Sequence, residues 1–383
     1  MTGHQEERAQ ILVIGAGAAG LATALELARH GLAPLVLERR SGGSGHPRAT
    51  ALTAETMQLM TGWGAEPQVR RLGFRSEHAM SVRSCLTGPE IHRLLFGDHV
   101  WTCAQDHLET ILAQRAAATG ARLRYGATLA GLHPADGGML ASVAAPAGPA
   151  TTIRARYVVG ADGARSAVRQ ATGIATSRAR TFGDWISILF RAPLRDHAGD
   201  QLYMVYGIGD PSTGGVLVPA DAADRWIRGI SWHPERGERL DDYDEKRCTA
   251  LIRSAAGIPG LPVEITGIRA FTMTAALADH YRAGRAVLVG DAAHVFTPAT
   301  GMGLNLAIHD ATVLARVLAD TIEHGDQPQA LDQYEQACRP LAEELLEPEL
   351  GPPEPARAIQ HACGGFPPAG QNFRVGGPQV HNG

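Results

Sequence analysis

The chain contains few of the residues that build disulfide frameworks or basic surfaces. Its five cysteines are odd in number and widely spaced, and no two form a C-x-x-C pair. This pattern excludes a disulfide scaffold and a redox dithiol, and it predicts reduced thiols. Lys246 is the only lysine, and the formal net charge is −4 at pH 7. We therefore expect no nucleic-acid partner, because there is no basic footprint for one.

No hydrophobic run in the sequence is long enough to cross a bilayer. Residues 11–25 carry no charge, but the segment is too short to span and includes three glycines. Acidic Glu6 and Glu7 stand where a secretion signal would be basic. We predict a soluble, cytoplasmic protein without integral membrane association.

Motifs for hydrolytic and metal chemistry are also missing. The sequence has no G-x-S-x-G stretch, and no second ligand lies at metal spacing from His294. A catalytic triad and a metal site are therefore not expected, and His294 is interpreted as a core or capping histidine.

The order of patterns along the 383 residues predicts an α/β fold with two interlocked parts. Residues 10–40 predict a strand, a turn, a helix and a strand. Residues 181–233 are rich in aromatic and β-branched residues and predict a mostly antiparallel sheet in a separate layer. After residue 285 the chain returns to strand, turn and helix. The chain thus leaves a nucleotide-binding layer, builds a sheet and comes back.

The stretch "GAGAAG" follows the first strand directly and opens the first helix. Gly15 allows the tight turn, Gly17 lets the backbone approach a pyrophosphate, and Gly20 lets the helix pack on the strand. The phosphates would lie at the helix N-terminus, where free N–H groups favour anions. Glu38 ends the next strand, where a carboxylate can accept ribose hydroxyls. This motif predicts a dinucleotide but does not separate FAD from NAD.

The stretch "GRAVLVGDAAHVFTPATGMGLN", residues 284–305, favours a flavin. Asp291 follows a predicted strand and can accept hydrogen bonds from the ribityl chain. Pro298 to Gly303 bring bare backbone to the start of the next helix. The first N–H groups of that helix suit the negative charge of a reduced flavin. A third turn, "GADGARSAVR", places Asp162 and Gly163 at the same predicted sheet edge, although Asp-Gly alone is usually a simple turn.

Together these motifs resemble those of the FAD-dependent aromatic hydroxylases, the single-component flavoprotein monooxygenases of the para-hydroxybenzoate hydroxylase and aromatic polyketide hydroxylase type. The resemblance covers residues 10 to about 345 and includes "HPRAT", "CAQDHLE" and "YEQACRP". It stops before the thioredoxin-like C-terminal domain that many polyketide hydroxylases have. The loop "TPATGMG" also departs from the commoner Pro-Pro and Gly-Gly forms.

The resemblance implies a Rossmann-like FAD-binding domain interleaved with a mostly antiparallel β-sheet substrate domain, followed by a C-terminal helical segment. The expected FAD-binding parts are 1–75, 101–178 and 269–350, the last with the C-terminal helices. The expected substrate-domain parts are 76–100 and 179–268, and residues 351–383 are expected to form an irregular tail. The implied FAD contacts are Gly15, Gly17, Ala18, Ala19, Gly20, Glu38, Arg39, Arg48, Gln105, Leu129, Asp162, Gly163, Gly290, Asp291, Pro298, Gly301, Met302, Gly303, Leu304 and Asn305.

The implied reaction uses NAD(P)H as a transient reductant and O₂, and inserts one oxygen atom into an aromatic or polyketide-like small molecule through a flavin C4a-hydroperoxide. Pro298 would lie against the flavin. Among the sheet-layer candidates Trp185, Tyr203, Tyr206, Trp232 and His233, the histidine is the preferred catalytic residue because its pKa suits proton exchange. Epoxidation, Baeyer-Villiger-type oxidation and a flavoprotein without oxygenase activity remain alternatives, and either a monomer or a homodimer is compatible with the sequence.

Overall fold

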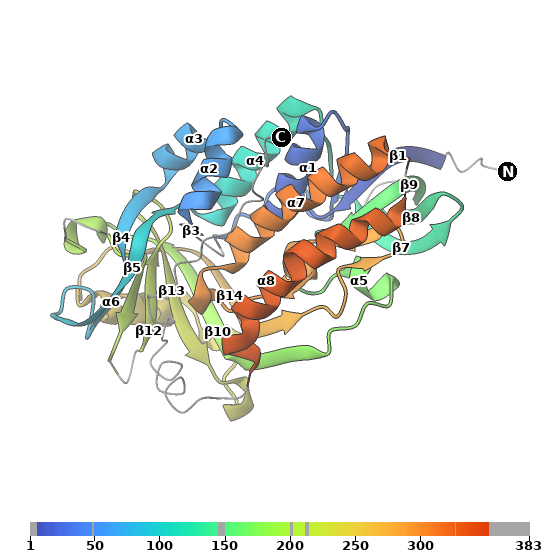
Figure 1. Cartoon of the computed structure of the whole chain (residues 1–383). Helices are drawn as coiled ribbons and strands as arrows, with labels where there is room; N and C mark the ends of the chain where they lie inside the picture. The colour runs from blue at the N-terminus through green and yellow to red at the C-terminus, as the bar shows by residue number, and fades with distance from the viewer. Residues whose placement is uncertain are drawn as a thin grey trace.

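The structure is a computed structural model that describes residues 6–47, 50–144, 150–199, 202–210, 214–325 and 327–351. Within these residues two sheets lie side by side, and helices cover them (Figure 1). The expected tail at 351–383 falls outside the described residues, apart from Gly351. No helix in the described ranges is both long and apolar enough to cross a membrane.

The first sheet has the strand order β15-β16-β9-β1-β2-β6, and β7 and β8 extend it beside β9. β1 pairs in parallel with both β2 and β9, and β16 pairs in parallel with β9. All four residues of β2 are buried, as expected for a strand covered on both faces. The strands of this sheet are β1 (Glu6–Ile14), β2 (Leu35–Glu38), β6 (Arg122–Tyr125), β7 (Thr128–Ala135), β8 (Gly138–Ala144), β9 (Thr151–Gly160), β15 (Arg282–Ala283) and β16 (Ala286–Leu288).

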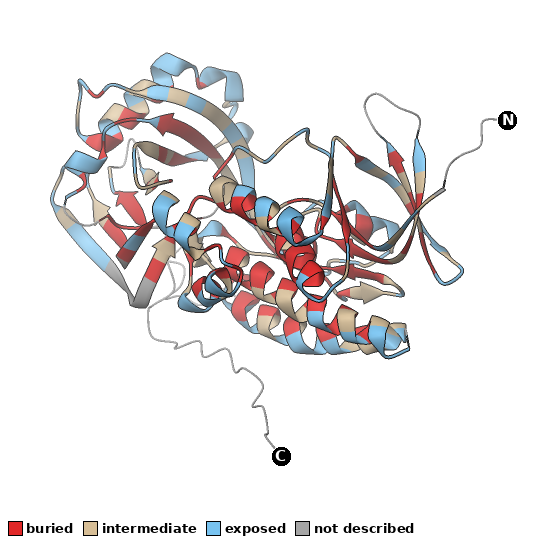
Figure 2. Cartoon of the chain, turned by 90° about the horizontal axis from the view of Figure 1, so that it is seen from above, coloured by how far each residue is buried: buried red, intermediate tan, exposed pale blue. Residues whose placement is uncertain are grey.

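Helices pack against the first sheet with their apolar sides inward (Figure 2). α1 connects β1 to β2 and lies between α4 and α7, so the predicted strand–helix–strand unit is confirmed. The helix predicted after residue 303 is also confirmed, with Leu304, Ile308 and Leu318 buried. These helices are α1 (Ala18–Arg29), α4 (Gln105–Thr119), α5 (Ala167–Ala171), α7 (Gly303–Glu323) and α8 (Asp332–Leu350).

The second sheet has the order β17-β14-β10-β13-β12-β11-β4-β5-β3 and is mostly antiparallel, as predicted; β11 and β4 pair in parallel. One face packs on α6 (Glu245–Ala256) and forms a second core around Trp226 and Phe190. The strands are β3 (Ala51–Leu52), β4 (Phe74–Arg83), β5 (Glu90–Thr102), β10 (Arg178–Arg191), β11 (Val205–Ile208), β12 (Gly215–Pro219), β13 (Arg225–Trp232), β14 (Glu264–Leu277) and β17 (His294–Val295). Short helices α2 (Ala54–Gly62) and α3 (Glu66–Leu72) join β3 to β4.

The expected boundary between residues 268 and 269 falls inside a continuous strand. β14 pairs with β10 from Glu264 to Leu277, so a boundary at this point would cut one ladder of the second sheet. The division of the chain into domains stays a prediction.

Tyr334 connects α8 to the first sheet by a hydrogen bond. Its hydroxyl donates a 2.9 Å hydrogen bond to the carbonyl of Leu288 in β16, and its side chain is fully buried. We expect Tyr334→Phe to lower the free energy of unfolding by about 1 kcal/mol, the usual net value of one such bond. Tyr125→Phe, at an exposed ring, is the control and should change it by less. Equal stability of the Tyr334 variant and the wild type in denaturant unfolding would contradict the assignment.

Candidate active site

The first glycine turn touches the second one, which leaves no room for side chains. Gly15 has φ +106°, and a Cβ there would lie 2.3 Å from the carbonyl oxygen of Ala161. A Cβ on Gly20 would lie 2.0 Å from the carbonyl oxygen of Gly15. α1 begins at Ala18, and no side chain caps its first turn. Free backbone N–H groups therefore point out of this turn, as a pyrophosphate requires.

Glu38 lies under the same turn. Its Oε2 accepts the N–H of Ala16 at 2.9 Å, and its Oε1 accepts Nε of Arg40 at 2.8 Å. Burial alone would raise the pKa of Glu38, but the hydrogen bonds from Arg40 and Ala16 lower it below the ordinary value. The carboxylate is therefore ionised, and it supports the turn directly. A contact from Glu38 to ribose hydroxyls stays a prediction.

The start of α4 completes this end of the site. Gln105 donates from Nε2 to Oε1 of Glu109 at 2.8 Å, and that oxygen is 3.8 Å from the position a Cβ of Gly17 would occupy. Glu109 is buried and faces the turn, yet nothing in its local sequence marked it as a site residue. Of the other implied contacts at this end, Arg39 is exposed and Leu129 of β7 is half-buried. Arg48 lies outside the described residues.

The carboxylate of Asp162 accepts hydrogen bonds from neighbouring groups of the protein. It accepts the N–H groups of Ala167 and Val168 at 2.6 and 3.1 Å and the hydroxyl of Ser166 at 2.5 Å, so it caps α5. Gly163 follows with φ +85°. This agrees with the simpler interpretation of Asp-Gly as a turn. A role of Asp162 toward FAD stays a prediction. Because its carboxylate already caps α5, Asp162 would contact FAD through its backbone.

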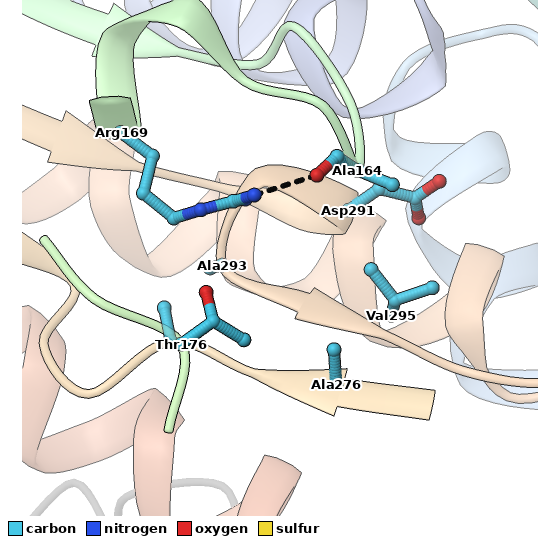
Figure 3. A pocket seen from close by; sticks show the side chains of 8 residues that line it. Ala164, Arg169, Thr176, Ala276, Asp291, Ala293 and Val295 are labelled. Carbon is cyan, nitrogen blue, oxygen red and sulfur yellow. Dashed lines mark hydrogen bonds between the residues drawn. The ribbon is translucent and has the colours of Figure 1, made fainter. Parts of the chain in front are cut away.

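Arg169 joins the second turn to the third. Its Nη2 donates to the carbonyl of Ala164 at 2.6 Å (Figure 3). Its Nη1 donates to the carbonyl of Ala292 at 2.8 Å. Arg169 closes the stretch "GADGARSAVR", but the sequence indicated no partner for it. The two turns are thus held together by one guanidinium group.

The third turn packs directly on the helices that flank it. Gly290 has φ +62°, and a Cβ there would lie 2.7 Å from Cβ of Ala19 and 3.3 Å from Cβ of Ala307. The next residue, Asp291, is exposed and borders a small pocket with Arg169 (Figure 3). The pocket is completed by Ala164, Thr176, Ala276, Ala278, Ala293 and Val295. All three turns therefore meet at one edge of the first sheet.

The N-terminus of α7 stands at the same edge. Pro298–Thr300 form a short 3₁₀ turn, Gly301 has φ +64°, and the N-cap residue Met302 provides no side-chain hydrogen bond to the first turn. Gly303 and Leu304 follow as the first residues of α7. The first N–H groups of a helix have no partner within the helix, and a contact from these groups to the pyrimidine end of a flavin stays a prediction.

The side chain of Asn305 has a structural role that the sequence did not indicate. Its Nδ2 donates to the carbonyls of Ala51 and Gly301 at 3.1 and 3.0 Å. Its Oδ1 accepts the N–H of Thr53 and the hydroxyl of Thr56 at 3.0 and 2.8 Å. The side chain therefore ties β3 and α2 to the start of α7. Only the backbone of Asn305 is left for a cofactor.

The second sheet presents an apolar patch beside this helix end. The patch consists of Met80, Val100, Met204 and Val205, with Ala51, Val82, Val216 and Val218 packed against it. Ala51 is the link, since its carbonyl accepts from Asn305 and its Cβ lies 3.9 Å from the position a Cβ of Gly301 would take. The patch therefore borders the flavin-facing turn.

The polar candidates of the second sheet lie elsewhere. Tyr203, Tyr206 and Trp232 belong to the core on the α6 side, and Tyr203 donates to Oε2 of Glu90 at 2.7 Å. Burial raises the pKa of Tyr206 to about 12. His233 pairs with Glu235 at 3.0 Å, and 40% of its side chain is exposed. These contacts lend no support to a catalytic role for His233, which stays a prediction.

The paired sheets and the shared edge of three glycine turns define a Rossmann-type flavoprotein. The family model described as the FAD binding domain matches residues 8–348, so the chain belongs to this family. The cofactor is FAD, and the residues fit it. The Gly15 and Gly290 turns leave room for backbone only, and neither α1 nor α7 has a side-chain cap at its N-terminus.

Curated relatives and solved structures agree with this family. A putative polyketide hydroxylase of Streptomyces coelicolor (strain ATCC BAA-471 / A3(2) / M145) is 35% identical over 382 residues, which cover 96% of this chain and 60% of the relative. The aklavinone 12-hydroxylase DnrF of Streptomyces peucetius is 34% identical over 375 residues, covering 93% of this chain and 76% of that protein. The chain thus spans about three fifths of the length of the first relative.

Two solved structures have the same fold. The flavin-dependent monooxygenase PieE, in complex with FAD and substrate, superposes with a TM-score of 0.83 at 25% identity, covering 92% of this chain and 64% of that chain. A ternary complex of aklavinone-11 hydroxylase with FAD and aklavinone gives a TM-score of 0.77 at 29% identity, covering 99% and 73%.

Gly17 is a position where a substitution should weaken FAD binding without disturbing the fold. A Cβ on Gly17 meets only Glu109 Oε1, at 3.8 Å, so Gly17→Ala should fold normally. The methyl group would occupy the space that a pyrophosphate needs, and we expect FAD to bind at least about tenfold more weakly, a loss of about 1.4 kcal/mol. Titration of the apoprotein with FAD measures this. Gly260→Ala, which has open space around it, should leave affinity unchanged, and full affinity of the Gly17 variant would remove the pyrophosphate from this turn.

Glu349, at the end of α8, binds the residue that precedes Pro298. Its carboxylate accepts the N–H of Thr297 at 3.2 Å and also the hydroxyl of Thr297. Burial raises the pKa of Glu349 above 4.5. The protonated form is thus favoured in the folded state, and its contribution to stability is lost as pH rises through the raised pKa.

Replacing Glu349 with Gln should remove this pH dependence. Below pH 4.5 wild type and Glu349→Gln should have similar midpoints of thermal unfolding. Toward neutral pH the variant should become the more stable, because the amide oxygen of Gln can accept the N–H of Thr297 and its NH₂ group can donate to the hydroxyl, without a buried charge. Glu344→Gln, at an exposed position of α8, should track the wild type. A constant difference at every pH would rule out titration of Glu349.

Proposed function

We propose that this chain is an FAD-dependent monooxygenase that inserts one oxygen atom from O₂ into an aromatic, polyketide-like small molecule, with NAD(P)H as reductant. The convergence of the three glycine turns and the uncapped start of α7 at one edge, next to an apolar patch of the second sheet, supports this proposal most. The named activities of the relatives agree with it.

Each part of the site has a role in this proposal. The start of α1 binds the pyrophosphate, and Asp291 accepts from the ribityl hydroxyls. The first N–H groups of α7 stabilise negative charge at the pyrimidine end, and Pro298 lies against the ring. When bound, FAD supplies hydride acceptance and oxygen activation. The protein positions the reactants and keeps water out, so it needs few catalytic side chains.

The apolar patch indicates the substrate class. Met80, Val100, Met204 and Val205 are themselves buried, and the partly buried Ala51 is the member that reaches the turn that would face the flavin. Apolar surroundings at this turn favour a flat, largely apolar ring system over a small charged acid. We propose a fused-ring phenol as substrate, in keeping with the aklavinone present in the complex of one structural relative.

The purified protein tests the activity. We expect it to be yellow, to consume NAD(P)H and O₂ faster when a fused-ring phenol is added, and to release a product heavier by one oxygen atom in mass spectrometry. Bound FAD without substrate-stimulated O₂ uptake would reject the monooxygenase. Product structure separates hydroxylation from epoxidation and from Baeyer-Villiger insertion.

Asp291 provides the matched test of cofactor geometry. Loss of a charged acceptor of ribityl hydroxyls should weaken FAD binding about tenfold or more in Asp291→Ala, since hydrogen bonds to charged groups contribute about 1.5–3 kcal/mol. Asp241→Ala, at an exposed aspartate that precedes α6 in the chain, should bind FAD as the wild type does. Full FAD occupancy in the Asp291 variant at limiting FAD would refute the ribityl contact.

A further inference from the structure

A cluster of polar side chains is buried between α7, α8 and β17, directly after the third turn in the chain. Nε2 of His294 lies 2.7 Å from Oδ2 of Asp310, and both side chains have 0% exposure. His309 precedes Asp310 on α7, and Cys338 of α8 is fully buried. The two helices run side by side over this point (Figure 1). None of these groups has a part in the proposed reaction.

Two atoms of this cluster, Nδ1 of His294 and the hydroxyl of Tyr281, have no hydrogen-bond partner within the described residues. Oδ1 of Asp310 has only weak partners, which are the ring of His309 at 3.5 Å and the thiol of Cys338. An unsatisfied buried polar atom costs about 1–3 kcal/mol, and several together call for a water molecule or an ion.

The geometry of the cluster suits a cation. The ligand atoms of His309, Asp310 and Cys338 all lie within 4.8 Å of one another. In a tetrahedral zinc site, with metal–ligand distances of about 2.0–2.3 Å, the ligand atoms are separated by somewhat less, so small rotations about side-chain bonds would close the site. One third of the His309 side chain is exposed, which gives a route from solvent. Imidazole, carboxylate and thiolate are the ligands that Zn²⁺ prefers.

We propose that His309, Asp310 and Cys338, with a water molecule as the fourth ligand, bind a zinc ion that joins α7 to α8. On binding, a Zn–S bond forms, and the proton of the Cys338 thiol passes to solvent. The thiolate and the carboxylate then balance the two positive charges. His294 holds the second carboxylate oxygen and so orients Asp310 toward the ion. The sequence predicted no metal site, because an adjacent His-Asp pair and one distant cysteine form no familiar ligand spacing.

This ion would hold the segments around the cofactor site in position and would take no part in the reaction. α7 begins at the turn that faces the flavin, and Glu349 at the end of α8 binds Thr297 just before that turn.

Zinc titration of the FAD-loaded protein tests the proposal. After dialysis against a chelator, ZnCl₂ is added in competition with a chromogenic chelator. We expect one tightly bound equivalent, and Cys338→Ser and His309→Gln should each weaken it by at least about tenfold. Cys248→Ser, at a buried cysteine of α6, and His324→Gln, at the exposed end of α7, are the matched controls and should bind zinc as the wild type does.

Cobalt substitution of the wild type gives a second readout. Co²⁺ should show the visible d–d bands of a tetrahedral site at wavelengths longer than those that oxidised flavin absorbs, and Cys338→Ser that still binds FAD should lose or shift these bands. Absence of tight zinc binding by the wild type would overturn the proposal and leave water as the occupant. Equal affinity in all four variants, the mark of an adventitious ion only, would overturn it as well.

Discussion

Backbone contact between separate turns is the constraint on which the cofactor site depends. The loop after β1 lies against Ala161, and the loop after β16 lies against α1 and α7, each at a distance that excludes a Cβ. Parallel pairing of β1, β9 and β16 ends all three strands at the same edge. Because the strands are held in this register by a fully buried core, the turns cannot separate to admit a side chain. The glycines follow from this packing and also expose the N–H groups that an anion needs.

Hydrogen bonds between distant segments then hold the turns in position at this edge. Arg169 bridges two turns through backbone carbonyls, Asn305 ties β3 and α2 to α7, and Glu349 holds Thr297 from the end of α8. Each of these side chains binds backbone groups, most of which lie in loops outside the regular strand pairing. Their partners are satisfied without water, which lets the loops stay fixed while they face an open site. Rigid loops of this kind reduce the conformational entropy lost when a cofactor binds.

The sequence predicted the parts of the fold that local signals determine. The first strand–helix–strand unit, the long helix after residue 303 and the mostly antiparallel second sheet follow from periodicity and glycine position, and all are present. The use of individual polar side chains could not be predicted. Asp162 caps α5, and Asn305 faces segments more than 240 residues earlier in the chain. A carboxylate beside a glycine turn has the same sequence signature whether it binds a cofactor or a helix end.

Two helix N-termini meet at this edge, and that explains why so few charged side chains are needed there. α1 and α7 each begin without a side-chain cap, so each presents partial positive charge to the site. One can hold a phosphate, and the other can hold a flavin that gains negative charge on reduction. A buried lysine is therefore unnecessary at this edge. Lys246, the only lysine of the chain, lies in α6, which packs on the second sheet. The charge comes from backbone groups fixed by the fold, so it needs no reorganisation when the redox state changes.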